Sequence, residues 1–78
     1  MPSYPALNGK QVVRVLESLG FYVDRIGSTH YQMVKPGHPR PVPVPVHAAE
    51  TLPTGTFRSI LRQAGLTPKQ FFQAYWNL

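Results

Sequence analysis

The chain has 78 residues, enough for one domain and too few for two, and a domain this small buries only about 60% of its unfolded surface. It has no cysteine, which excludes disulfide bonds and thiolate metal sites. Residues 1–10 lack an apolar run long enough for a signal peptide, and no segment approaches the roughly 20 apolar residues that span a bilayer, so we expect a soluble cytoplasmic protein without membrane contact. Eight Lys and Arg against three Asp and Glu give a charge of +5, which favours a polyanionic partner such as nucleic acid, although a basic surface without that role is the alternative.

The first predicted element is a helix that begins after Asn8 and ends at Gly20. Asn8 is a favourable N-cap residue, and Gln11 stands where its side chain can reach back to the cap backbone. Apolar residues then recur at helical spacing: Val12, Val15, Leu16 and Leu19. The opposite side carries Lys10, Arg14, Glu17 and Ser18, so the helix is amphipathic with a mostly basic outer face.

From Phe21 the apolar period changes to two, which is typical of strands. Apolar side chains alternate with polar ones on both sides of a Gly27-Ser28 turn: Phe21, Val23, Tyr31 and Met33. This pattern predicts a β-hairpin whose apolar set faces the helices. His30 and Gln32 then face the open side of the sheet, where Val34 weakens the alternation, and His30 is predicted to be accessible.

The segment R-P-V-P-V-P-V-H, from Arg40 to His47, fits either polyproline II or an edge strand. Every second residue at the start of this segment is a proline: Pro41, Pro43 and Pro45. In a strand their missing N–H groups lie on one edge, while the alternating valines donate to the neighbouring strand and share one face for the core. We therefore predict a third strand with a blocked outer edge, reached through a turn at Pro36 to Pro39.

Two helices are predicted after the strands. Pro53-Thr54-Gly55 opens the first, which Gly65 closes, and its core-spaced residues are Phe57, Ile60, Leu61 and Ala64. Arg58 and Arg62 share its outer face, either with an anion between them or as a solvated surface. Thr67 to Gln70 forms a capping box with proline at the first helical position, which opens a short last helix with an aromatic stripe: Phe71, Phe72, Tyr75 and Trp76. The fold class is α+β, in the order α-β-β-β-α with an extra short C-terminal helix.

Four motifs stand in order along the chain: G-K-Q-V-V-R-V-L-E-S-L-G-F at 9–21, G-S-T-H at 27–30, V-P-V-H at 44–47 and L-P-T-G-T-F-R-S-I-L-R-Q-A-G-L at 52–66. With this element order they resemble the HicA family of toxins from type II toxin–antitoxin systems. The resemblance covers roughly residues 7–72, so we expect one HicA-like domain over 1–78. It implies a fold like the double-stranded-RNA-binding domain with a three-stranded antiparallel sheet, endoribonuclease activity on mRNA, and neutralisation by a HicB-type antitoxin.

By the family pattern His30 takes the catalytic position, and Gly27 and Ser28 match the turn that presents it. Two features depart from the pattern, because Thr29 stands where a second histidine is common and the third strand is unusually rich in proline. RNA carries its own nucleophile, the ribose 2′-hydroxyl, so a histidine that titrates near neutral pH can act as general base or acid beside a positive charge. Neither a metal nor any other cofactor is required. Candidates for RNA contact, which the sequence does not rank, are Lys10, Arg25, Ser28, Lys35, Arg58 and Arg62.

The other two histidines have weaker assignments. His47 is either a turn residue that bonds nearby backbone or a second catalytic group, and His38 is expected to be solvated in its P-G-H-P turn. No spacing among the histidines resembles a pair of metal ligands, so no metal site is predicted. Two alternatives to the toxin remain: a non-catalytic RNA-binding module of the same fold, and a protein-interaction domain whose basic face meets an acidic partner.

Overall fold

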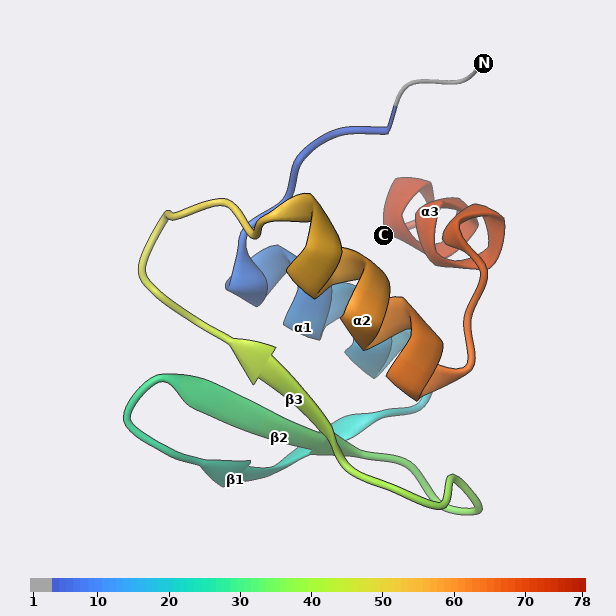
Figure 1. The fold of residues 1–78 in the computed structure, drawn as a ribbon. Helices are drawn as coiled ribbons and strands as arrows, with labels where there is room; N and C mark the ends of the chain where they lie inside the picture. The colour runs from blue at the N-terminus through green and yellow to red at the C-terminus, as the bar shows by residue number, and fades with distance from the viewer. Residues whose placement is uncertain (1–3) are drawn as a thin grey trace.

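A three-stranded antiparallel sheet with three helices makes up residues 4–78, the part of the chain that a computed structural model describes (Figure 1). The elements in chain order are α1 (Gly9–Ser18), β1 (Tyr22–Ile26), β2 (His30–Val34), β3 (Val42–Pro45), α2 (Thr54–Ala64) and α3 (Pro68–Trp76). This order confirms the α+β fold class and the extra C-terminal helix. None of the helices in residues 4–78 is long and apolar enough to cross a bilayer.

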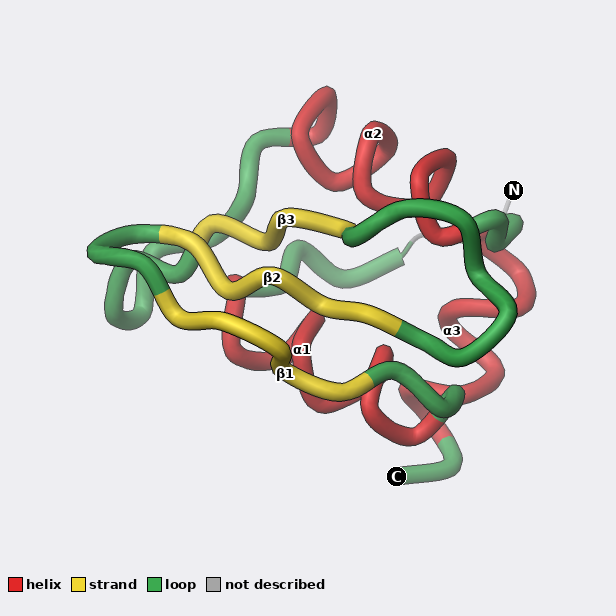
Figure 2. Tube along the Cα trace, turned by 90° about the horizontal axis from the view of Figure 1, so that it is seen from below, coloured by secondary structure: helices red, strands yellow, loops and turns green. Residues whose placement is uncertain are grey.

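The helices lie on one side of the sheet, and the strands are arranged in the order β1-β2-β3 (Figures 1 and 2). In Figure 2 the three strands lie in front of the helices, so the sheet face toward the viewer is covered by no element of residues 4–78. Met33 in β2 is fully buried on the helix side, whereas His30 in the same strand is exposed. The predicted division of the hairpin into a core face and an open face is therefore confirmed.

A β-bulge in β1 changes which side chains lie on the open face. Val23 pairs with Met33, but the next pair is Arg25 with Gln32, so Asp24 is an extra residue in β1. Because cross-strand partners share a face, Arg25 lies on the open face beside Gln32. A simple two-residue period from Val23 would have placed Arg25 on the helix side instead.

The proline-rich segment forms the edge strand β3, which is shorter than the predicted Arg40–His47 stretch. Val42 and Val44 are fully buried, which confirms that the valines share the core face. Just beyond the strand, the Val46 N–H donates to the Thr29 carbonyl at 2.8 Å, toward β2. The prolines alternate with the valines, so their nitrogens, which carry no hydrogen, lie on the other side of the strand. The outer edge of β3 therefore has no N–H donors, as predicted.

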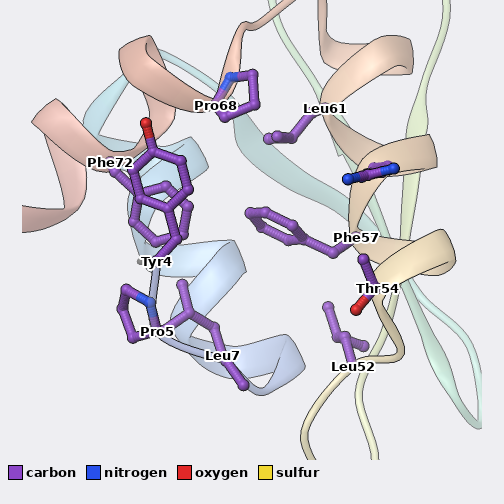
Figure 3. A pocket seen from close by; sticks show the side chains of 11 residues that line it. Tyr4, Pro5, Leu7, Leu52, Thr54, Phe57, Leu61, Pro68 and Phe72 are labelled. Carbon is purple, nitrogen blue, oxygen red and sulfur yellow. The ribbon is translucent and has the colours of Figure 1, made fainter. Parts of the chain in front are cut away.

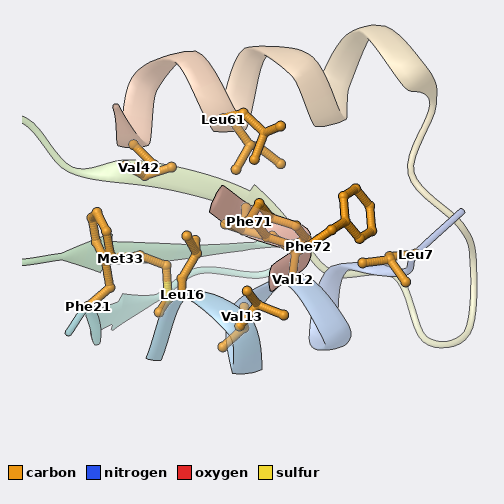
Figure 4. Packing of buried hydrophobic residues seen from close by; sticks show 14 residues of the cluster. Leu7, Val12, Val13, Leu16, Phe21, Met33, Val42, Leu61, Phe71 and Phe72 are labelled. Carbon is orange, nitrogen blue, oxygen red and sulfur yellow. The ribbon is translucent and has the colours of Figure 1, made fainter. Parts of the chain in front are cut away.

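Both predicted capping boxes are present, and they fix where α1 and α3 begin. The Asn8 side chain accepts from the Gln11 N–H at 2.9 Å, and the Gln11 side chain accepts from the Asn8 N–H at 2.8 Å. Thr67 and Gln70 make the same reciprocal pair in front of α3. The helices pack one apolar cluster against the sheet (Figure 4), with the largest fully buried side chains being Phe71, Phe72, Leu16, Met33 and Ile60.

His38 corrects one expectation from the sequence, because it is not simply solvated. Its Nε2 lies 2.7 Å from the Gln63 carbonyl in the last turn of α2, and its ring meets the Phe21 ring edge-to-face at 5.4 Å. A carbonyl in the last turn of a helix has no intrahelical donor, so the imidazole N–H satisfies it. His38 therefore joins the β2–β3 connection to the end of α2. This contact spans 25 residues of sequence, and local turn chemistry gave no sign of it.

Candidate active site

His30 begins β2 on the uncovered face of the sheet, and the preceding turn holds its backbone. The Gly27 N–H donates to the His30 carbonyl at 2.8 Å, which leaves Ser28 and Thr29 as the two central residues of the turn. Across the sheet His30 pairs with Pro45 of β3. The predicted accessibility of His30 is confirmed, since its side chain is exposed.

A hydrogen bond fixes one side of the His30 ring. Thr29 Oγ1 lies 2.8 Å from His30 Nδ1. Because the two ring nitrogens have distinct roles, a partner on Nδ1 helps to determine the orientation of the ring and leaves Nε2 for a ligand. Thr29, the residue that departs from the family pattern, is thus the neighbour that holds the imidazole.

Arg25 is the basic side chain that the sheet places nearest to His30 on the same face. It pairs with Gln32, and His30 lies two residues from Gln32 along β2. Diagonal neighbours of this kind are about 7–8 Å apart, within reach of a long side chain. The guanidinium can therefore meet the same phosphate as the imidazole, with the bidentate geometry that arginine offers to phosphate oxygens.

The N-terminus of α1 lies at the same end of the sheet. Gly9 packs against the backbone of Pro45 and Val46, so closely that a Cβ on Gly9 would overlap the Pro45 carbonyl oxygen. Since Pro45 is the register partner of His30, this contact places the start of α1 at the His30 end of β3, in the helical layer behind the sheet, and the exposed Lys10 follows Gly9 there. Ser28, in the turn itself, is exposed as well.

Three other predicted RNA contacts are not brought to His30. The Lys35 ammonium lies over the Phe21 ring, 5.6 Å from its centroid, beside the end of α1. Arg58 and Arg62 are exposed on α2, in the helical layer on the far side of the sheet. Of the six candidates, Arg25 lies on the His30 face and Ser28 in the turn before His30. Lys10 lies at the start of α1 on the other side of the sheet, and Lys35, Arg58 and Arg62 lie elsewhere.

His47 follows β3, two residues beyond Pro45, and is exposed. Its carbonyl accepts from the Glu50 N–H at 2.9 Å across a turn in which Ala48 has a φ of +48°. The backbone of His47 is therefore part of a turn, and a catalytic role for its side chain stays a prediction. Among residues 4–78 no three His, Asp or Glu side chains are grouped closely enough to hold a metal ion.

A groove of about 350 Å³ lies on the helical side, between the N-terminal segment and helices α2 and α3 (Figure 3). Its walls are mostly apolar, and Tyr4 stacks on Phe72 there with ring centroids 4.3 Å apart. None of the open-face residues of the sheet lines it. Apart from the Tyr4 hydroxyl, its polar side chains are Thr54 and Arg58, so an anion could bind there, but no histidine lines it. The candidate site is therefore the sheet face around His30.

Comparison with known families shows to which family the chain belongs. The family model described as HicA toxin of bacterial toxin–antitoxin matches residues 9–66, about three quarters of the 78-residue chain. The chain belongs to the HicA toxin family. A search among curated proteins finds no match. Membership makes the HicA chain a toxin of a toxin–antitoxin system, and the matched segment contains both the Gly27–His30 turn and the three strands that form the open face.

The place of Arg25 in this HicA chain is the feature that sequence reasoning missed. A signal was present, because Val23 and Ile26 are three residues apart, with two charged residues between them, whereas a regular strand repeats every two. Ile26 pairs with Tyr31 on the helix side, so both apolar residues keep the same face and the bulge absorbs the extra residue.

Proposed function

We propose that this HicA toxin is an endoribonuclease that cleaves mRNA without a metal, with His30 as general acid or base, and that a HicB-type antitoxin neutralises it. The observation that carries the proposal is the placement of His30. It is exposed on an uncovered sheet face, with Nδ1 on the Thr29 hydroxyl and Arg25 as its diagonal neighbour. We expect the toxin to act in the cytoplasm, where mRNA is translated.

The arrangement suits cleavage by the 2′-hydroxyl of the RNA itself. His30 Nε2 takes the 2′-hydroxyl proton while the 2′-oxygen attacks the adjacent phosphorus. The phosphorus–O5′ bond breaks, and the leaving oxygen takes up a proton, so the products are a 2′,3′-cyclic phosphate and a 5′-hydroxyl. Arg25 supplies positive charge where the phosphorane gains negative charge. The proton of the leaving oxygen can come from water or from His47, which lies beyond the Pro45 partner of His30.

The antitoxin is proposed to cover the same face. The chain carries a net charge of +5, Arg25 lies on the His30 face, and Lys10 is exposed at the start of α1, behind the same end of the sheet. An acidic partner surface would complement this face and would exclude RNA from His30.

Cleavage of a labelled single-stranded RNA in EDTA tests the proposal. Wild-type protein should cut the RNA, and His30→Ala should lose at least about a hundredfold in rate, the usual contribution of a positioned acid–base group. The same RNA with 2′-deoxy sugars should stay intact. Since His30 is exposed, its truncation should leave the melting temperature unchanged.

The outcomes separate the toxin from its main alternative. Equal cleavage by wild-type protein and His30→Ala would overturn the role of His30, and cutting of the 2′-deoxy substrate would overturn the mechanism. Intact RNA with equal binding by both proteins would instead support a non-catalytic RNA-binding module of the same fold.

A further inference from the structure

The uncovered sheet face carries an aromatic ring at the end away from His30. Tyr22 in β1 is 51% exposed and pairs with Val34, the last residue of β2. Val34 alternates with the buried Met33, so the Tyr22–Val34 pair lies on the open face. A tyrosine ring has an apolar body and a polar tip, and such rings are enriched where proteins contact partners.

The face between Tyr22 and His30 has a consistent composition. Cross-strand pairing places Arg25 beside Gln32, Gln32 beside Pro43, and His30 beside Pro45. The Arg25 guanidinium can bind phosphate, and the Gln32 amide can bind base edges. The rings of Pro43 and Pro45 are half-buried and form a rigid apolar surface between them. The acidic residue nearby, Asp24, is the extra residue of the bulge and has no cross-strand partner in this row.

We propose that this face is a track for single-stranded RNA, in which Tyr22 stacks on one base while His30 holds the phosphate that is cut. The proposal deepens the proposed function and rests on it. His30 and Val34 are four residues apart on β2, or about 13 Å at the usual strand rise. Sheets of RNA recognition motifs stack two or three bases on such a surface. Tyr22 is thus a specificity-determining residue that selects a well-stacking base one to three nucleotides from the cut.

The shape of the face favours single-stranded RNA over a duplex. Bases can lie flat on a sheet only when they are unstacked from a partner strand. Arg25 between Tyr22 and His30 supplies the positive charge that a phosphate backbone follows.

Binding of an uncleavable RNA, with every 2′-hydroxyl methylated, to the 78-residue chain tests the track. Tyr22→Ala should weaken binding about 5- to 100-fold, the range found when one aromatic stacking partner is removed, and Tyr22→Phe should bind like wild type. An abasic nucleotide moved stepwise along the RNA should weaken wild-type binding most at one position near the cut. In Tyr22→Ala the abasic nucleotide at that position should have no further effect, because the stacking partner is already missing.

Ile26→Ala is the matched control. Ile26 is on the same strand and is 63% exposed, but it pairs with Tyr31 on the helix side of the sheet. Its truncation removes a similar apolar surface from the same strand and should leave RNA affinity unchanged. Thermal melting of both variants shows whether each still folds.

The result that overturns the track is equal RNA affinity for wild type, Tyr22→Ala and Ile26→Ala, or an equal loss for both alanine variants. If Tyr22→Ala weakens antitoxin binding and leaves RNA binding intact, the ring belongs to a protein interface and the inference is wrong. Failure of the proposed function is seen separately, in the cleavage assay with His30→Ala. A protein that cuts through His30 but binds RNA without regard to Tyr22 would retain the toxin mechanism and refute the track alone.

Discussion

At the scale of single residues, the hydrogen bond between Thr29 Oγ1 and His30 Nδ1 leads to a test of how the imidazole is held. Thr29→Val keeps the shape of the side chain but removes its hydroxyl. An intramolecular hydrogen bond contributes about 0.5–1.5 kcal/mol, so kcat for RNA cleavage should fall roughly two- to tenfold. KM and the melting temperature should not change, since Thr29 acts through His30 and stabilises no core contact.

Thr29→Ser is the rescue for that variant, because serine restores the hydroxyl. Activity close to wild type in Thr29→Ser, beside the loss in Thr29→Val, supports a positioning role for the hydroxyl. If both substitutions lower kcat equally, the methyl group and its packing matter more than the hydrogen bond, and the assignment fails.

The backbone conformation of Ala48 affects the stability of the protein. Its φ of +48° places a side chain in the left-handed region, which costs about 1–2 kcal/mol relative to a right-handed conformation. Ala48→Gly should therefore raise the free energy of unfolding by about 0.5–1 kcal/mol, after the extra entropy of glycine in the unfolded chain. Ala49→Gly is the neighbouring control, which should be neutral or slightly destabilising. Denaturant unfolding measures both, and equal effects would show that Ala48 stores no strain.

At the scale of the elements, Gly9 couples α1 to the strand beside His30. Alanine normally favours a helix over glycine by up to about 1 kcal/mol, but a Cβ on Gly9 would overlap the Pro45 carbonyl oxygen. Gly9→Ala should therefore destabilise the protein by about 1–3 kcal/mol, as overpacked sites do. RNA cleavage should fall too, because Pro45 pairs with His30.

Gly55 provides the opposite case in α2. No atom lies within 4 Å of a Cβ built on it, so Gly55→Ala should stabilise the helix and leave cleavage unchanged. Thermal melting and the RNA cleavage assay on Gly9→Ala and Gly55→Ala measure both effects. A stable, fully active Gly9→Ala protein would show that α1 does not set the position of β3.

The same elements show what the sequence can and cannot predict. Caps, turns and periods are local, so the order of elements, the capping residues and the accessibility of His30 were all predicted correctly. The bulge at Asp24 was missed because strand pairing, rather than the strand itself, decides which residue is extra. His38 was misjudged because its partner carbonyl is 25 residues away, and long-range contacts leave no periodic signal in sequence.

At the scale of the whole molecule, the two layers have different tasks. The helices and the inner sheet face contain the apolar core, in which side chains such as Phe71 and Met33 are fully buried. The outer sheet face contains the candidate chemistry, and it is free of covering elements in residues 4–78 (Figure 2). Substitutions on the outer face should therefore change RNA affinity and cleavage with little change in stability. The contribution of a charged residue to RNA binding can then be measured separately for the sheet face and for the helices.

The salt dependence of RNA binding distinguishes the two layers. Each phosphate contact on single-stranded nucleic acid contributes about 0.7 to the slope of log affinity against log salt concentration, because binding releases counterions. Arg25→Gln, on the His30 face, should lower affinity for the 2′-O-methyl RNA and reduce this slope by about 0.7. Arg62→Gln removes the same charge from α2, in the helical layer, and should leave the slope unchanged. Equal slopes for Arg25→Gln and wild type, with a lower slope for Arg62→Gln, would place the RNA on the helices and contradict the assignment of the sheet face.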